Sequence, residues 1–265
     1  MTLETRVSIS EAEQLVKKVF LKNGVREDLA ASVSTALVAA EAEGQVGHGF
    51  SRVKDYIAQV KSKKINVDAI IKIEHPKPTS ISIDADYGFA YPALDQGISE
   101  GALVAKEFGS AVVSIFNSHH CGALSVQVEK IANHGLIGLM MANTPKAIAP
   151  WGGKEPFFGT NPIAFAVPRI AKDPLVIDLS LSKVARGKIM HAKKVNTKIP
   201  EGWALDSSGK PTVDPDQALK GSMLPIGEAK GSALALIVEI LAATFSGSRP
   251  SNEASSFLNP DGDPP

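Results

Sequence analysis

The chain has 265 residues, enough for one large domain or two smaller ones. Its 28 basic and 28 acidic side chains give a net charge of zero, which argues against a nucleic acid or an anionic membrane as partner, because both favour a basic surface. A single cysteine, Cys121, excludes an intrachain disulfide and fits a reducing compartment. The polar N-terminus is unlike a secretory signal, and the longest apolar run is short for a membrane span. We therefore expect a cytoplasmic protein.

The first 65 or so residues are predicted to be helical. Ser10 and Glu13 match a capping box at the start of a helix over residues 10–23, which carries apolar residues at helical spacing. A second helix is expected over residues 26–43, with Gly44 as its C-cap. A third apolar series begins at Phe50. The sequence thus indicates an N-terminal helical segment, residues 1–75.

From His75 onward, strands are predicted to alternate with helices. Strands are expected at residues 80–84, at 111–116 as a buried strand, and at 136–141, 163–167 and 175–179, with helices at 91–108 and 124–133. Residues 210–215 are predicted as a loop, and 231–245 as an apolar helix that contains Glu239, which needs a partner or a water-facing side. The pattern indicates an α/β core over residues 76–248, followed by a polar, proline-rich tail over 249–265.

A turn rich in glycine and proline, residues 150–162, precedes the strand at 163–167. Thr160 and Asn161 place hydrogen-bonding groups next to that strand, and the small residues allow a backbone to approach a ligand. The alternative is a turn with no functional role.

His48 lies in a turn flanked by glycines, and Arg52 follows four residues later. At that spacing the two side chains can face the same way on a helix, which makes them a candidate acid/base and anion-binding pair. The alternative is a histidine that caps a helix beside a solvated arginine.

His119, His120, Cys121 and Gly122 stand where a strand gives way to a helix. Such a turn offers free backbone N–H groups to an anion, although neither a Rossmann nor a P-loop glycine motif is present. The alternative is a turn with inert histidines. A nucleophilic role for Cys121 and a zinc site are both disfavoured, because the chain lacks a second cysteine and a His-Glu-x-x-His motif.

Eight ordered motifs, spread over nearly the whole chain, resemble the malate/L-lactate dehydrogenase family. They are residues 40–52, 117–122, 149–153, 158–164, 177–182, 187–189, 200–206 and 229–232. This family is the non-Rossmann group that also holds ureidoglycolate, sulfolactate and diketogulonate enzymes and the Δ1-piperideine-2-carboxylate/Δ1-pyrroline-2-carboxylate reductases. Ala123–Leu124 and Val128–Glu129 look nearest to the cyclic-imine reductases.

The resemblance implies an NAD(P)H-dependent oxidoreductase with its own mixed-sheet α/β fold, working as a homodimer on a small carboxylate substrate. It implies that His48 is the acid/base residue, that Arg52 holds the substrate carboxylate, and that Thr160 and Asn161 help to wall the site. It further implies cofactor contacts from residues at two strand ends and one helix start: His120, Cys121, Gly122, Ala123, Leu124, Asp178, Leu179, Ser180, Leu181, Ser182, Lys230 and Gly231. No metal is implied.

Three departures from the family pattern stand out. Gly47 occupies a position where the family usually has a serine that hydrogen-bonds the catalytic histidine, and Glu228 replaces a glycine beside a cofactor contact. The chain also stops where family members continue, so it resembles a C-terminally truncated member. The leading hypothesis is interconversion of a 2-oxo acid and its 2-hydroxy acid. The alternatives are reduction of a cyclic imine carboxylate, and an inactive remnant that only dimerises.

Overall fold

The computed structural model describes residues 6–264, which form two compact units. Unit 1 holds the chain as far as Lys130 together with residues 256–264, and unit 2 holds residues 131–255. The boundaries predicted from composition, after residues 75 and 248, stay a prediction. The fold class is confirmed: the protein is a mixed α/β structure with helices and small sheets.

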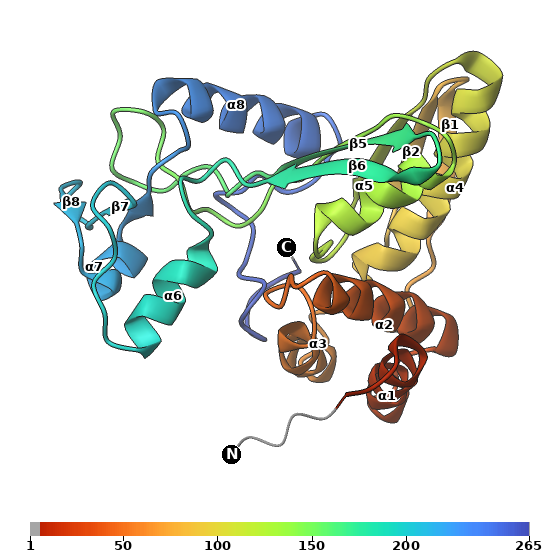
Figure 1. Ribbon diagram of the computed structural model, residues 1–265, viewed down its shortest axis with the longest axis horizontal. Helices are drawn as coiled ribbons and strands as arrows, with labels where there is room; N and C mark the ends of the chain where they lie inside the picture. The colour runs from red at the N-terminus through yellow and green to blue at the C-terminus, as the bar shows by residue number, and fades with distance from the viewer. Residues whose placement is uncertain (1–5, 265) are drawn as a thin grey trace. The chain divides into compact units, whose positions relative to one another are not determined.

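Unit 1 begins with three helices, α1 (Ile9–Lys22), α2 (Glu27–Ala42) and α3 (Ser51–Lys61), which lie next to one another in Figure 1. Their apolar faces form one core, in which Phe20, Leu37 and Tyr56 are fully buried. The predicted capping box, Ser10 and Glu13, lies two residues too far along the chain. Ser8 and Glu11 make it instead, because Ser8-x-x-Glu11 fits the same pattern and lets Ile9 begin the helix.

The sheet of unit 1 has the order β1-β2-β3, with β1 (Lys72–Lys77) antiparallel to β2 (Ser80–Asp84) and β2 parallel to β3 (Val112–Phe116). Helix α4 (Ala90–Phe108) packs closely on it, because Cβ atoms at Gly97 and Gly101 would meet side chains of the sheet. Strand β3 is half-buried and not buried as predicted, since only one of its faces meets α4. The connection β3–α5 (Leu124–Asn133) carries the predicted histidine turn.

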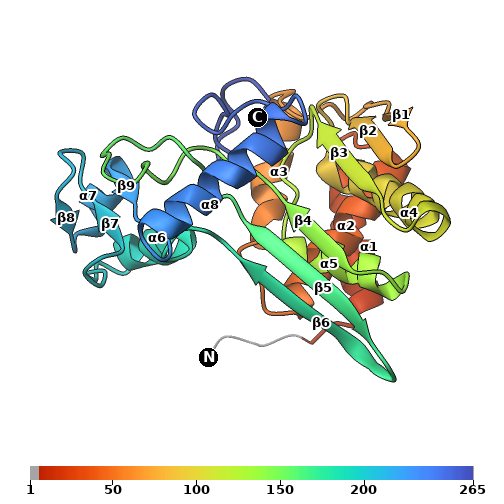
Figure 2. The same ribbon diagram turned by 90° about the horizontal axis from the view of Figure 1, so that it is seen from above.

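Unit 2 contains two sheets. In the first, β4 (Gly138–Met141), β5 (Ile163–Arg169) and β6 (Lys172–Leu179) are antiparallel and lie side by side in Figure 2. The second has the order β8-β7-β9, made of β7 (Ala204–Leu205), β8 (Pro211–Thr212) and β9 (Ser222–Met223). The predicted loop at 210–215 therefore contains a short strand. A strand of two residues is too short to produce a periodic pattern in the sequence.

The helices of unit 2 are α6 (Arg186–Lys194), α7 (Pro215–Lys220) and α8 (Ala229–Glu239). Helix α8 continues as a π-helical turn, η1 (Ile240–Thr244), so the predicted apolar helix is present and begins two residues early. A core that includes Ile148, Leu181 and Val238 joins these helices to the sheets. No helix among residues 6–264 is long and apolar enough to span a membrane.

Candidate active site

The turn before α3 places two of the predicted site residues together in unit 1. His48 lies in the turn, where its N–H donates to the carbonyl of Gln45, and Arg52 lies in the first turn of α3. The Arg52 Nε donates to the carbonyl of Gly47 over 2.6 Å, and its Nη1 lies 3.4 Å from Asp55 Oδ2. These two contacts fix the guanidinium and leave other N–H groups of the fork available to a planar anion.

A buried group of rings surrounds His48. We define the histidine cluster as His48, His119, His120, Tyr56 and Tyr91. The ring of His48 stacks on that of His120, with 5.4 Å between centroids and an interplanar angle of 16°. The hydroxyl of Tyr56 lies 2.6 Å from His120 Nδ1 and 2.9 Å from the hydroxyl of Tyr91. All members belong to unit 1.

Burial makes the histidines of the cluster neutral at pH 7. Burial first, and the charge of Arg52 second, lower the pKa of His48 from 6.5 to about 4. Burial and then Lys64 lower the pKa of His119 to about 3, and burial lowers the pKa of His120 well below its usual range. A neutral imidazole can accept a proton at one nitrogen and donate one at the other.

Three nitrogen atoms of the cluster are buried and have no hydrogen-bond partner among residues 6–264: His48 Nδ1 and both ring nitrogens of His119. The first agrees with the sequence observation on Gly47, because glycine offers no hydroxyl to His48. Room exists for one, since a Cβ on Gly47 would meet no atom within 4 Å. His48 Nδ1 therefore lacks the serine hydroxyl that the family resemblance would place at position 47.

Several residues of the cluster were missed in the sequence. Tyr56 lies four residues after Arg52 on α3, so the helical spacing that linked His48 to Arg52 could have extended to it. Tyr91 and Phe257 gave no such signal, because they arrive from distant parts of the chain. The Phe257 ring lies 5.0 Å from that of His120 and 5.7 Å from that of His119.

In the turn from His120 to Leu124, both the backbone conformation and the packing favour glycine at position 122. Gly122 has a φ of +71°, and a Cβ there would lie 2.5 Å from the hydroxyl of Tyr91. Ala123 and Leu124 are buried, and Cys121 is half-buried. Helix α5 begins at Leu124, so the N–H groups of its first turn have no partner within the helix and suit an anionic group.

In unit 2, Asn161 is fully buried and its side-chain amide is held within the unit. Its Nδ2 donates to the carbonyl of Ala235 and to Glu239 Oε2. Glu239 also accepts from the N–H and the hydroxyl of Ser251, so the carboxylate that the sequence left without a partner has three donors. Thr160, half-buried, shares contacts with Thr144.

The other predicted cofactor residues lie at two places in unit 2. Asp178 and Leu179 are exposed at the end of β6, Ser180 is half-buried, and Leu181 and Ser182 are buried beyond it. Lys230 is exposed in the first turn of α8, and a Cβ on Gly231 would collide with the carbonyl of Ile226. Glu228 occupies the N-cap position of α8 with a φ of +58° and is exposed.

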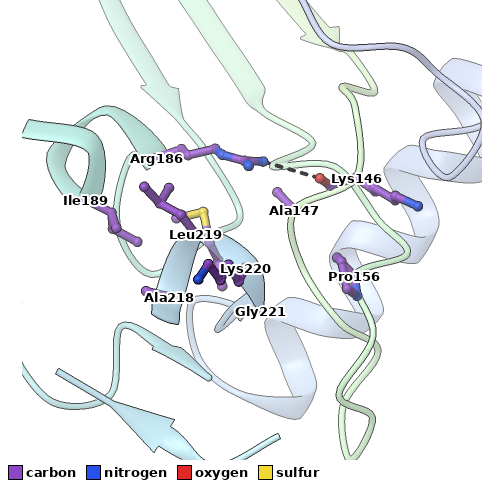
Figure 3. A pocket seen from close by; sticks show the side chains of 10 residues that line it. Lys146, Ala147, Pro156, Arg186, Ile189, Ala218, Leu219, Lys220 and Gly221 are labelled. Atoms are coloured by element: carbon purple, nitrogen blue, oxygen red, sulfur yellow. Dashed lines mark hydrogen bonds between the residues drawn. The ribbon is translucent and has the colours of Figure 1, made fainter. Parts of the chain in front are cut away.

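A separate cavity of about 200 Å³ in unit 2 is shown in Figure 3. It is lined by Lys146, Ala147, Pro156, Arg186, Ile189, Ala218, Leu219, Lys220, Gly221 and Met223. Arg186 Nη1 donates to the carbonyl of Lys146 over 3.4 Å, while the ammonium of Lys146 points away from the guanidinium. None of the predicted site residues lines this cavity, and its cations do not converge.

The sequence profile described as "Malate/L-lactate dehydrogenase" matches residues 7–265. The chain belongs to the malate/L-lactate dehydrogenase family. It is 49% identical over 259 residues to the (2R)-3-sulfolactate dehydrogenase (NADP(+)) of Chromohalobacter salexigens, covering 98% of this chain and 78% of that protein. It is 36% identical to a Δ(1)-pyrroline-2-carboxylate reductase of Agrobacterium fabrum, covering 97% of this chain and 75% of that protein.

Solved structures agree with this assignment. The Δ1-piperideine-2-carboxylate reductase of Pseudomonas syringae pv. tomato superposes with a TM-score of 0.92 at 34% identity, covering 95% of this chain and 76% of that chain. The sulfolactate dehydrogenase of Methanocaldococcus jannaschii superposes with a TM-score of 0.88 at 36% identity, and the match covers 96% of this chain and 73% of that chain. The protein is an NAD(P)-dependent oxidoreductase of the class that acts on CH–OH or C=N groups.

The chemistry of the described residues fits a dinucleotide. The starts of α5 and α8 carry the partial positive charge of a helix N-terminus, and Lys230 adds an exposed cation to the second of them. Glu228 is the one charge opposed to a phosphate at that helix start. Among residues 6–264 no three metal-ligating side chains are grouped so as to hold a metal ion.

Proposed function

We propose that this protein reduces a small 2-oxo acid to its 2-hydroxy acid, and catalyses the reverse reaction, with His48 as acid/base and Arg52 as carboxylate clamp. The observation that carries the proposal is the pairing, in one turn, of a neutral imidazole with an oriented guanidinium. The reduced nicotinamide supplies the hydride when it is bound. All other steps are assigned to side chains of this chain.

Arg52 binds the carboxylate through the N–H groups that Gly47 and Asp55 leave unused. A bidentate pair would hold the substrate in one orientation and keep its carbonyl carbon in a fixed place. Arg52→Ala should therefore raise KM about 100-fold for carboxylate substrates, because a charge-assisted bidentate contact is lost. Lys54→Ala, an exposed cation on the same helix, is the control. An unchanged KM in the Arg52 variant would remove Arg52 from the site.

His48 exchanges the proton at the carbonyl oxygen. Reduction leaves negative charge on that oxygen, and hydroxy-acid oxidation needs a base at the same place. His48→Ala should lower kcat by roughly 100- to 10,000-fold. His75→Ala, a largely exposed histidine of the same unit, is the control. Full turnover by the His48 variant would dismiss the acid/base role.

We propose that residues 120–124 contact the cofactor and, as a separate proposal, that Asp178, Leu179, Ser180, Leu181, Ser182, Lys230 and Gly231 do so. Thr160 and Asn161 contribute to the substrate wall, and the bonds to Glu239 and Ala235 hold the Asn161 side chain in place. A fluorescence titration with NADH and NADPH tests the cofactor site. Saturable binding supports it, while failure to bind either cofactor would favour the non-catalytic remnant.

The choice of substrate follows from two groups of relatives. The relative at 49% identity is named for 3-sulfolactate, and several at 35–36% are named for cyclic imine carboxylates. Both share the carboxylate that Arg52 would bind, and they differ in whether the proton goes to oxygen or nitrogen. We rank the 2-oxo acid first on identity. Assays with 3-sulfopyruvate, pyruvate, oxaloacetate and the two cyclic imines decide between them, and a preference for the imines would reverse the ranking.

We also propose that the protein is a cytoplasmic homodimer. Helix α8 and η1 expose apolar side chains that a lone chain would leave in water, among them Leu236, Ile237, Ile240 and Phe245. The reducing compartment is supported by the single cysteine. Light scattering after gel filtration should give twice the mass of one chain, and Ile240→Lys should halve it. A monomeric wild type would overturn the dimer.

A further inference from the structure

Three buried groups of the histidine cluster form a short hydrogen-bonded row. The hydroxyl of Tyr91 lies 2.9 Å from the hydroxyl of Tyr56, which lies 2.6 Å from His120 Nδ1. Both tyrosines and His120 are at most 9% exposed. Burial raises the pKa of both phenols and lowers that of His120, so all three are neutral at pH 7. Each group therefore brings one proton to the row.

These protons can be arranged in two ways. Tyr91 can donate to Tyr56 and Tyr56 to His120 Nδ1, or His120 Nδ1–H can donate to Tyr56 and Tyr56 to Tyr91. In the second arrangement the Tyr91 proton turns away from Tyr56, its oxygen partner at 2.9 Å, and the nearby Cys121 offers a sulfur, which is only a weak acceptor. The Gly122 backbone packs against the same hydroxyl. A buried donor without a strong acceptor is costly, so the first arrangement is the stable one.

We propose that Tyr56 is a positioning residue that holds His120 as the Nε2–H tautomer, and that the His120 ring in turn holds His48. Donation from Tyr56 occupies Nδ1, so the His120 proton must sit on Nε2. His48 lacks a serine at position 47 and a partner for Nδ1, and the described contact on its ring face is the stack on His120. His120 then offers a fixed N–H donor, which suits an oxygen acceptor on the cofactor or substrate.

The tautomer is tested by nitrogen NMR on protein labelled with 15N-histidine and free of cofactor, with His120 assigned from a His120→Asn variant. We expect His120 to show an unprotonated Nδ1 and a protonated Nε2. Tyr56→Phe removes only the hydroxyl and should give a mixture of tautomers. Tyr91→Phe is the matched control, because Tyr56 can still donate to His120. A protonated Nδ1 in the wild type, or an unchanged tautomer in Tyr56→Phe, would overturn the proposal.

The effect on His48 rests on the proposed function and is tested by kinetics. Tyr56→Phe should lower kcat on the order of 10-fold, because a ring that is free to rotate loses its alignment. KM for the carboxylate should stay within about twofold, since Arg52 is held by Gly47 and Asp55. A wild-type kcat in Tyr56→Phe with a disturbed tautomer would refute the positioning of His48 and leave the proposed function standing. A wild type inactive on all substrates would refute the proposed function, and the NMR result would still decide the tautomer.

Discussion

At the scale of single residues, Gly47 decides how His48 is held. A neutral imidazole with a buried, unpartnered Nδ1 rotates more easily than one with a hydrogen bond, and rotation costs alignment in proton transfer. The space beside Gly47 is open, so a small polar side chain can be added without a clash. The residue before the histidine is therefore the simplest place to improve the site.

Gly47→Ser should raise kcat by roughly threefold to tenfold, because the new hydroxyl supplies a partner to the adjacent imidazole. Steady-state kinetics with the preferred cofactor and substrate measure the change. Gly47→Ala adds the Cβ without the hydroxyl and should leave kcat near the wild-type value. Equal rates for the two variants would mean that His48 needs no partner at Nδ1.

The lowered pKa of His48 predicts a distinctive pH profile. In the proposed reaction the neutral form of His48 would be the base for hydroxy-acid oxidation, and with a pKa of about 4 this form is fully present at neutral pH. The kcat/KM for oxidation should therefore show no inflection near pH 6.5 between about pH 6 and pH 8. An unperturbed histidine would lose activity as the pH fell through 6.5, so an inflection there would contradict the buried, neutral His48.

The pairing of His48 with Arg52 could be predicted from the sequence, because the spacing of four residues acts locally. His119 and His120 were also singled out in the sequence, as a turn, but the aromatic residues around them were not. Tyr91 bonds to Tyr56 across 35 residues of sequence and Phe257 packs on His120 across 137, and no local pattern encodes such contacts. Gly122 was noted in the sequence as part of a turn that could bind an anion, and the structure also gives it a packing reason in Tyr91.

At the scale of elements, buried charges tie distant segments to helices. Lys64, just after α3, is 3% exposed, and its ammonium donates to the carbonyls of Ser256, Asn259 and Asp261. Burial lowers its pKa, and Asp261 opposes that shift. Residues 256–264, a part of the segment that the sequence described as a polar tail, are thus held on unit 1, with Phe257 against the histidines.

Lys64→Met should release this segment, because three carbonyls lose one shared donor. Hydrogen exchange at residues 256–264 should accelerate at least tenfold, which corresponds to a local loss of about 1.4 kcal/mol. Lys61→Met, at an exposed position on α3, is the control and should leave exchange unchanged. Unchanged exchange in the Lys64 variant would mean that packing of Phe257 alone holds the segment.

The carboxylate of Glu239 plays the same part in unit 2. It joins α8 to Asn161 and Ser251 through three donors at 2.6–2.9 Å. Glu239→Gln replaces one acceptor oxygen with an NH2 that faces donors, so the free energy of unfolding should fall by about 2–4 kcal/mol. Urea titrations measure it, with the exposed Glu253→Gln as control. Equal midpoints would show that the network relaxes without cost.

Local signals account for the elements that were predicted and for those that were missed. Helices of ten residues or more carry repeated apolar spacing, and α1, α2, α4 and α5 appear within two residues of their predicted ends. Strands β7, β8 and β9 pair over two residues each, and β1 is mostly exposed and charged, so neither type carries a periodic signal. The cap at Ser8 was ambiguous because two overlapping motifs fit.

At the scale of the whole molecule, unit 1 is built from two separate chain segments, since residues 256–264 join the first 130. Composition cannot reveal such a division, because it depends on which distant residues meet. The same unit holds three histidines that are neutral when folded: His48, His119 and His120. The stability of the protein must therefore depend on pH.

The direction in which the free energy of unfolding changes with pH follows from the number of protons that the folded and unfolded chains bind. The pKa values of the three histidines lie below the unfolded value of 6.5, so the unfolded chain binds more protons as the pH falls below 6.5. As the pH is lowered from about 6.5 towards 4, the free energy of unfolding should decrease. The decrease should be up to about 1.4 kcal/mol per pH unit for each fully buried histidine. Urea titrations at a series of pH values measure this slope.

His119→Phe isolates one contribution. The ring sits between Tyr56 and Phe257, and both of its nitrogens lack partners among residues 6–264, so an apolar ring should be accepted. The variant should lose less stability than the wild type as the pH falls, since one proton-binding group is removed from the unfolded chain. His75→Phe, at an exposed position of the same unit, is the matched histidine-to-phenylalanine control. An unaltered slope in His119→Phe would mean that His119 takes up its proton in the folded state, which a ring buried against Lys64 disfavours.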